Sequence, residues 1–162
     1  MGLSASTRVS AILRNSSEFD AACDAAYDEC LDLAQHAFSG LRPYQLLPAS
    51  SRLHAAASAA IPLVKRWAPS PPTQLQVDRA LRSVVGADET LTRAQFKEFA
   101  VEVLKEEIVS NARGTVLRGI PVGLVGIAGV GMATRAGRDA TGRAIGAYAL
   151  GISAAVYISL CF

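Results

Sequence analysis

The chain has 162 residues and a mass of 17.0 kDa, which suits one domain, or a small domain with an appended segment, but not two full-sized domains. Its composition is 51% hydrophobic and only 19% charged, which excludes a long disordered chain. A net charge of +2 is too small to indicate a nucleic-acid-binding domain, and three cysteines are too few for a disulfide framework.

Charge and glycine divide the sequence into two dissimilar parts. Residues 1–112 carry 11 Lys and Arg against 13 Asp and Glu, a net of −2, whereas residues 113–162 carry five Arg and the single acid Asp139. The second part also holds most of the 13 glycines. We therefore expect a polar N-terminal segment over 1–17, a helical domain over 18–112 and a membrane segment over 113–162.

The N-terminal segment is polar and rich in serine, without the long apolar core of a secretory signal. Its first six residues, Met1 to Ser6, fit the N-myristoylation pattern, in which a glycine follows the initiator Met and a serine stands four positions later. Gly2 is thus a candidate lipidation site. The alternative is an ordinary polar terminus.

The spacing of apolar residues predicts an amphipathic helix from about Glu18 to Phe38, which Ser16 or Ser17 could cap. A row of aspartates on the opposite side is expected to be solvated. Cys23 and Cys30 lie on the apolar stripe, and we expect them to be small core residues rather than metal ligands. The aspartates of this row are Asp20, Asp24, Asp28 and Asp32.

Further helices are predicted over about 50–67, where Pro62 should restrict or kink the helix, from Thr73 to Val84 or Val85, and from Thr92 onward. On the last of these helices, Phe96, Phe99 and Val103 share one face, which we expect to pack against the apolar stripe of the first helix. Because no segment alternates with a period of two, the sequence predicts an all-α fold with at most a pair of very short strands.

Two stretches of the sequence match at an offset of 50 residues. Each unit reads as a helix, a short loop with an apolar residue, a glutamine four positions later and then a new helix. The identical pairs are Asp28 and Asp78, Leu31 and Leu81, Ala37 and Ala87, Leu41 and Leu91, and Gln45 and Gln95.

This organisation resembles the EF-hand family. The segment from Leu91 to Phe96 looks like the end of an EF-hand loop that enters its second helix, and the segment from Leu41 to Leu46 is similar. The resemblance covers residues 18–110, and its combination with a glycine-rich C-terminus is similar to a plant group of calcium-binding EF-hand proteins. It implies a pair of helix–loop–helix units.

The sequence departs from the family at the positions where calcium would bind. A calcium loop needs a cluster of oxygen ligands that ends in a bidentate Glu at its twelfth position. Carried onto the second unit, the only carboxylate ligand is Asp88, and the twelfth position is the neutral Gln95. Asp88 and Gln95 are therefore the candidate metal ligands, Ca²⁺ is the candidate cofactor, and the resemblance implies a scaffold rather than strong calcium binding.

The C-terminal part contains two uncharged runs, 119–134 and 144–162. A bilayer span takes about 20 residues, so we expect either a transmembrane helical hairpin or a tail anchor formed by 144–162 alone. A buried helix pair in a soluble core is the alternative. We expect the helical domain to lie on the cytosolic side of the membrane, which would suit a myristoyl group and free cysteines.

Small residues recur along both uncharged runs at helical spacing. In lipid, such surfaces permit close helix–helix contact, so they are candidate packing sites within a hairpin or between copies of the chain in a homo-oligomer. The glycines concerned are Gly119, Gly123, Gly126, Gly142, Gly146 and Gly151.

The sequence shows no catalytic constellation. The glycines between Gly126 and Gly131 have the wrong spacing for a nucleotide-binding loop, and His36 and His54 stand outside metal-ligand spacings. We therefore expect a non-enzymatic, membrane-anchored EF-hand-like adaptor with a protein partner and no nucleic acid. The alternatives are a membrane-associated calcium sensor and a small oligomerising glycine-rich membrane protein.

Overall fold

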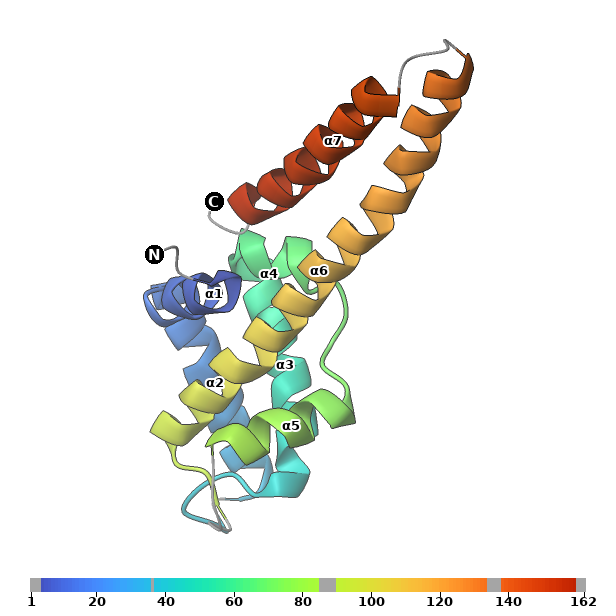
Figure 1. The fold of residues 1–162 in the computed structure, drawn as a ribbon. Helices are drawn as coiled ribbons and strands as arrows, with labels where there is room; N and C mark the ends of the chain where they lie inside the picture. The colour runs from blue at the N-terminus through green and yellow to red at the C-terminus, as the bar shows by residue number, and fades with distance from the viewer. Residues whose placement is uncertain (1–3, 36, 85–89, 134–137, 160–162) are drawn as a thin grey trace. The chain divides into compact units, whose positions relative to one another are not determined.

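The computed structural model describes residues 4–35, 37–84, 90–133 and 138–159, with the side-chain surroundings of 119–142 and 159 left out (Figure 1). The structure is 83% helix, and no strand forms within the described residues. The predicted all-α class is therefore confirmed.

Seven α-helices and one short 3-10 helix follow one another in the described chain. The chain divides into two compact units, 1–109 and 110–162, and the division falls inside the longest helix. The elements are α1 (Ala5–Arg14), α2 (Ser17–Leu33), η1 (Pro43–Gln45), α3 (Leu46–Ala60), α4 (Pro62–Trp67), α5 (Gln74–Val84), α6 (Arg93–Ala133) and α7 (Arg138–Ser159).

Helix α1 was not predicted, because residues 1–17 were expected to be a polar segment. Ser4 caps the helix, since its side chain accepts a hydrogen bond from the backbone N–H of Thr7. Val9 and Leu13 are fully buried, and α1 contacts α2. Three large apolar residues, Val9, Ile12 and Leu13, among serines and arginines make too weak a pattern to identify a helix without its packing partner. Gly2, the candidate lipidation site, lies outside the described residues.

Helix α2 begins where the sequence predicts and ends earlier than expected. The Ser16 side chain accepts a hydrogen bond from the Phe19 N–H at 3.2 Å, which caps the helix. The helix ends at Leu33 rather than Phe38, and Gln35 has a left-handed backbone with φ of 52°. The predicted stripe is confirmed as buried at six residues, Phe19, Ala22, Cys23, Ala26, Tyr27 and Cys30. It is wrong at its end, because Leu33, Ala34 and Ala37 were expected on it and are not buried. Both cysteines are free.

The helix expected over 50–67 is two helices, and it starts at Leu46 rather than Ser50. The break falls at Ile61, which is extended as residues before a proline usually are, and Pro62 opens α4. His54 of α3 ties the pair together, because its Nε2 lies 2.7 Å from the carbonyl oxygen of Ala68. Helix α3 contacts α2, α4 and α5, so it runs through the centre of the first unit.

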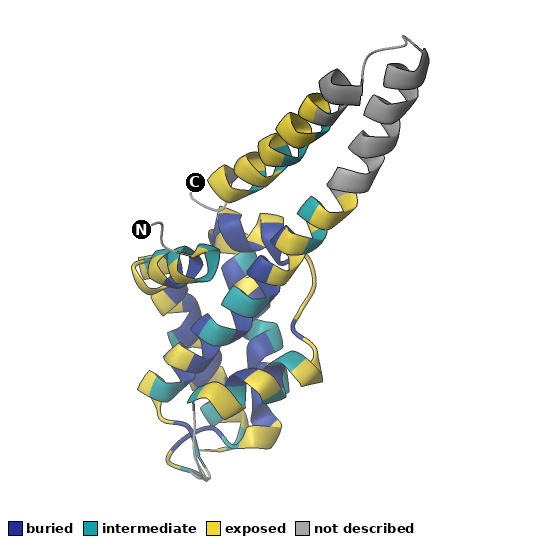
Figure 2. Cartoon of the chain, in the orientation of Figure 1, coloured by how far each residue is buried: buried dark blue, intermediate teal, exposed yellow. Residues whose placement is uncertain are grey.

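Aromatic side chains of α6 pack against α2. The ring of Phe96 lies 5.7 Å from the ring of Tyr27 and 5.9 Å from that of Phe99, measured between centroids. Phe96, Phe99 and Val103 are fully buried. Figure 2 shows buried residues, in dark blue, along the helices of residues 1–109. The predicted packing of the α6 face on the α2 stripe is confirmed at Tyr27 and Phe96.

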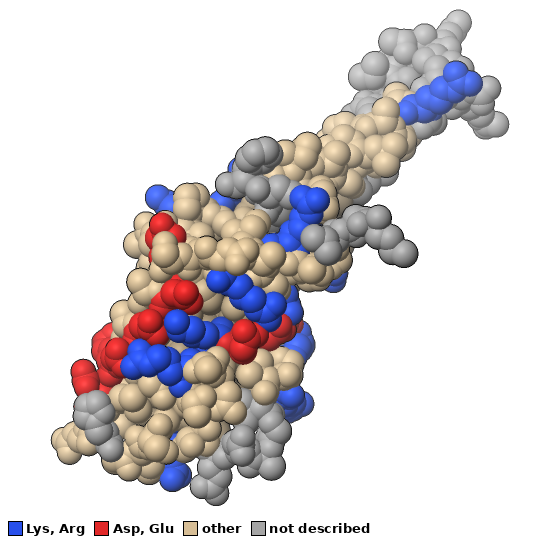
Figure 3. All heavy atoms as spheres, turned by 90° about the vertical axis from the view of Figure 1, so that its left-hand side faces the viewer, with Lys and Arg blue, Asp and Glu red and all other residues tan. Residues whose placement is uncertain are grey.

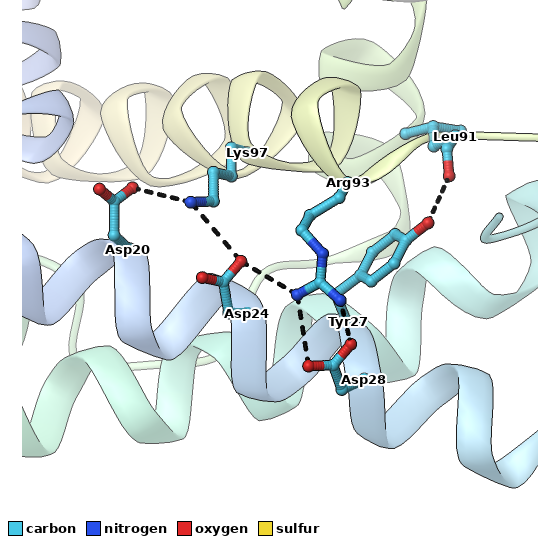
Figure 4. A network of polar contacts seen from close by, with 7 residues as sticks. All are labelled: Asp20, Asp24, Tyr27, Asp28, Leu91, Arg93 and Lys97. Carbon is cyan, nitrogen blue, oxygen red and sulfur yellow. Dashed lines mark hydrogen bonds and ion pairs between the residues drawn. The ribbon is translucent and has the colours of Figure 1, made fainter.

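The aspartate row of α2 is paired rather than simply solvated, which corrects the expectation from the sequence. Lys97 of α6 lies 3.3 Å from Asp20 and 3.5 Å from Asp24, and Arg93 pairs with Asp24 at 3.2 Å and also with Asp28 (Figure 4). Acidic and basic side chains gather side by side on this face (Figure 3). These side chains are partly exposed, so each pair contributes up to about 1 kcal/mol.

The described part of the chain contains no helix that is both long enough and apolar enough to cross a membrane. The expected transmembrane hairpin or tail anchor is therefore not supported. Glycine, serine and tyrosine stand among the apolar residues of α7 and lower its mean hydropathy. The run 119–134 and the end of the run 144–162 lie outside the residues whose side chains are described.

Phe99→Ala should destabilise the chain by about 3–5 kcal/mol, because it leaves a cavity in the core between α2 and α6. Denaturant unfolding followed by the fluorescence of the only tryptophan, Trp67, measures this change. Glu102→Ala, on the same helix but in contact with Lys105 rather than the core, should be almost silent. Equal and small effects of the two changes would show that this part of α6 is not in the core.

Glu107 should make stability depend on pH near neutrality. Its side chain is buried in α6, its Oε2 has no hydrogen-bond partner among the described residues, and burial raises its pKa from 4.5 to about 7. The folded state therefore holds the proton more tightly than the unfolded state. This contribution, up to about 3 kcal/mol, is present below pH 4.5 and is lost as the pH rises through 7.

The free energy of unfolding, measured by denaturant titration at several pH values, should thus fall between about pH 4.5 and pH 7, which are the two pKa values, and should level off above them. Glu107→Gln should remove this fall, because the amide does not titrate. Parallel pH profiles for the two proteins would show that Glu107 is not the group responsible.

Candidate functional site: two paired loops and a cavity

The loops that follow α2 and α5 meet through a single antiparallel bridge. The N–H of Leu41 donates to the carbonyl oxygen of Leu91 at 3.0 Å, and the N–H of Leu91 donates back to that of Leu41 at 2.7 Å. Both leucines are fully buried. These are the two residues that the offset of 50 aligns, so the sequence repeat corresponds to a structural pair of helix–loop–helix units.

The bridge depends on a glycine and a tyrosine beside it. A Cβ atom placed on Gly40 would overlap the carbonyl oxygen of Leu91, so only glycine allows the two backbones to approach this closely. The hydroxyl of Tyr27 donates to the same carbonyl oxygen at 3.4 Å, which links the bridge to the stripe of α2 (Figure 4).

The matching glutamines of the two helix–loop–helix units make the same hydrogen bond. The Oε1 atom of Gln45 accepts from the N–H of Arg42 at 2.9 Å, and that of Gln95 accepts from the N–H of Thr92 at 2.9 Å. Each side chain therefore reaches back to the start of its own helix and satisfies an N–H that the helix leaves unpaired. The oxygen that would face a cation at the twelfth loop position is used as a helix cap in both units.

The structure places only one of the two predicted metal ligands. Gln95 is the cap just described, and Asp88 lies outside the described residues. Within the residues that are described, no three or more His, Cys, Asp and Glu side chains come together in a way that could hold a metal ion. The assignment of Asp88 and Gln95 as calcium ligands stays a prediction.

Beside the first loop lies an open cavity of about 310 Å³, which the sequence did not reveal. It is bounded by the end of α2, by η1 and by the start of α3. Leu33 and Tyr44 stand 64% and 68% exposed among its lining residues. The lining residues are Cys30, Leu33, Ala34, Tyr44, Gln45, Pro48 and Arg52.

Among the described residues of that lining, Arg52 is the only charged one. Its Nε lies 2.9 Å from the Oε1 of Glu29, and its Nη1 lies 3.6 Å from the Sγ of Cys30. Burial raises the pKa of the Cys30 thiol while Arg52 opposes the shift, so the sulfur stays a neutral thiol at neutral pH and is a poor nucleophile.

The glycines predicted to pack helices fall into two groups. An added Cβ on Gly146 or Gly151 would meet no atom within 4 Å, so neither is in close contact with a described residue. Their packing against another copy stays a prediction. The surroundings of the other four, Gly119, Gly123, Gly126 and Gly142, are outside the described part.

Gly40→Ala should weaken the bridge between the loops and destabilise the chain by about 1–3 kcal/mol, because the backbones must separate to admit the Cβ atom. Gly114→Ala is the matched control, since its Cβ would meet no atom within 4 Å in the middle of α6. That change should be neutral or stabilising by up to about 1 kcal/mol. Thermal melts of both variants check the contrast, and an equally stable Gly40→Ala would contradict the close approach.

Comparisons with known proteins assign no family to this chain. No family model matches it, and neither does any curated protein or any solved structure. The functional interpretation therefore depends on the residues and contacts of the chain itself.

Proposed function

We propose that this chain is a non-enzymatic helical adaptor, held at a membrane by its C-terminal segment, that presents its helical domain to a protein partner. The observation that carries the proposal is the exposure of α7. From Arg143 to Ile158 no residue is buried, and no charged residue follows Arg143 (Figure 2). Such a helix presents a large apolar surface that a further partner can cover.

The helical domain fits an EF-hand-like scaffold that has kept its paired loops. Two helix–loop–helix units, α2 with α3 and α5 with α6, are joined by one short antiparallel bridge between equivalent leucines. In both, a glutamine fills the place of the last calcium ligand and caps the exiting helix. This substitution supports a scaffold that holds its shape without a cation, as an adaptor requires.

The exposed apolar surface of α7 is best suited to contact with a membrane. Leu150 is 73% exposed and Ile158 54% exposed, and the aromatic rings of Tyr148 and Tyr157 add to the same uncharged surface. Tyrosine is favoured at the boundary between lipid and water, where its ring is apolar and its hydroxyl stays wet. The free, buried cysteines of α2 suit a cytosolic position of the helical domain.

A membrane-associated calcium sensor is the second candidate, favoured by the paired loops. Calorimetric titration of the chain with calcium separates the two functions. We expect no binding at micromolar calcium, because ligand charge sets affinity in such loops and both twelfth positions are neutral glutamines that already cap helices. Binding with a micromolar constant would favour the sensor.

The full chain should float with phospholipid vesicles in a density gradient, and Ala154→Arg should reduce the bound fraction strongly. Ala154 is an exposed residue of α7, and a charged side chain on an apolar surface opposes contact of that surface with lipid. Ala56→Arg, an equally simple change at an exposed position of α3, should leave flotation unchanged. A wild-type chain that stays at the bottom of the gradient would refute membrane association.

A further inference from the structure

We propose that the cavity between the end of α2 and the start of α3 binds an acidic peptide segment of the protein partner, with one large apolar side chain seated in it. The inference rests on the proposed adaptor function and names the chemistry of its partner. The cavity, of about 310 Å³, is at the small end of the range for binding pockets and would take one aromatic or aliphatic side chain.

The walls of the cavity are suited to an apolar anchor. Leu33, Ala34 and Pro48 are aliphatic, and Tyr44 adds an aromatic ring. Leu33 and Tyr44 remain 64% and 68% exposed, so a ligand confined to the cavity would leave much of their surface in water, whereas a peptide that continues past its edge would cover it. Tyrosine and arginine are also the residue types that most often dominate the energy of protein interfaces.

The charge of the lining selects an acidic partner. Arg52 contributes a guanidinium, and no carboxylate stands among the described residues of the lining. The Nε of Arg52 is paired with Glu29, but the two side chains are 34% and 57% exposed, and such ion pairs are weak in water. A peptide carboxylate can therefore share the guanidinium with Glu29 or replace it, and arginine is well suited to hold a carboxylate through two N–H groups.

The same geometry disfavours a cation in this cavity. The Oε1 of Gln45 already accepts the hydrogen bond of the Arg42 N–H, so it is not directed at a metal. A guanidinium in the lining also repels a divalent ion. The cavity beside the first loop is therefore better suited to a peptide than to a cation.

Fluorescence polarisation with two labelled peptides tests the proposal on the full chain. Both probes are short peptides with a central Leu-Trp pair, flanked by glutamates in one and by lysines in the other. We expect the glutamate peptide to bind at least about tenfold more tightly. The full chain carries a net charge of +2, so general electrostatic attraction would also favour the glutamate peptide. Tyr44→Ala leaves the charge unchanged, so its effect on binding separates the cavity from this general attraction.

Two variants locate the binding. Tyr44→Ala removes an exposed ring and Arg52→Gln removes the guanidinium, and each should weaken binding of the glutamate peptide by about tenfold without unfolding the chain. Leu75→Ala removes an equally exposed apolar side chain from α5, outside the cavity, and should leave affinity unchanged.

Failure to bind the glutamate peptide, equal affinity for both probes, or insensitivity to Tyr44→Ala and Arg52→Gln would overturn the proposal. Such a result would leave the adaptor function standing if the full chain still floats with vesicles. A chain that binds the peptide through the cavity but does not float would instead overturn membrane anchoring alone.

Discussion

Two backbone hydrogen bonds between Leu41 and Leu91 restrict how the helices of residues 1–109 can be arranged. They hold the loop after α2 against the loop before α6, and the hydroxyl of Tyr27 reaches the same carbonyl oxygen. The ring of the same tyrosine packs against the ring of Phe96 in the aromatic core. Because buried backbone groups must be paired, a bridge between fully buried leucines tolerates little displacement, and the close passage at Gly40 follows from it.

Apolar packing and charge have different parts in joining α2 to α6. Fully buried side chains such as Phe19, Phe96 and Phe99 provide most of the stabilisation, since each buries a large apolar surface. The ladder of Asp20, Asp24 and Asp28 with Arg93 and Lys97 is partly exposed and adds little energy per pair. Its regular spacing instead favours one register of the two helices, because a shift along the axis would separate every pair.

The two paired loops are each followed by a glutamine that caps the helix it belongs to. The end of each loop is therefore ordered by the chain's own hydrogen bonds. The proposed role as an adaptor agrees with this order, since a scaffold that is already ordered loses less entropy when it binds a partner. It also leaves the cavity beside Arg52 as the place where the first unit offers both apolar surface and charge.

The sequence by itself determined what depends on neighbouring residues. The stripe of α2, a cap at Ser16 or Ser17 and the interruption at Pro62 are all local patterns. Only the tertiary structure decided what depends on distant contacts. Helix α1 exists because Val9 and Leu13 find a core, and the aspartates of α2 are paired because α6 brings two cations beside them. The cavity beside Arg52 likewise needs α2, η1 and α3 together, because hydrophobic spacing shows which face a helix buries but not which side chains meet it.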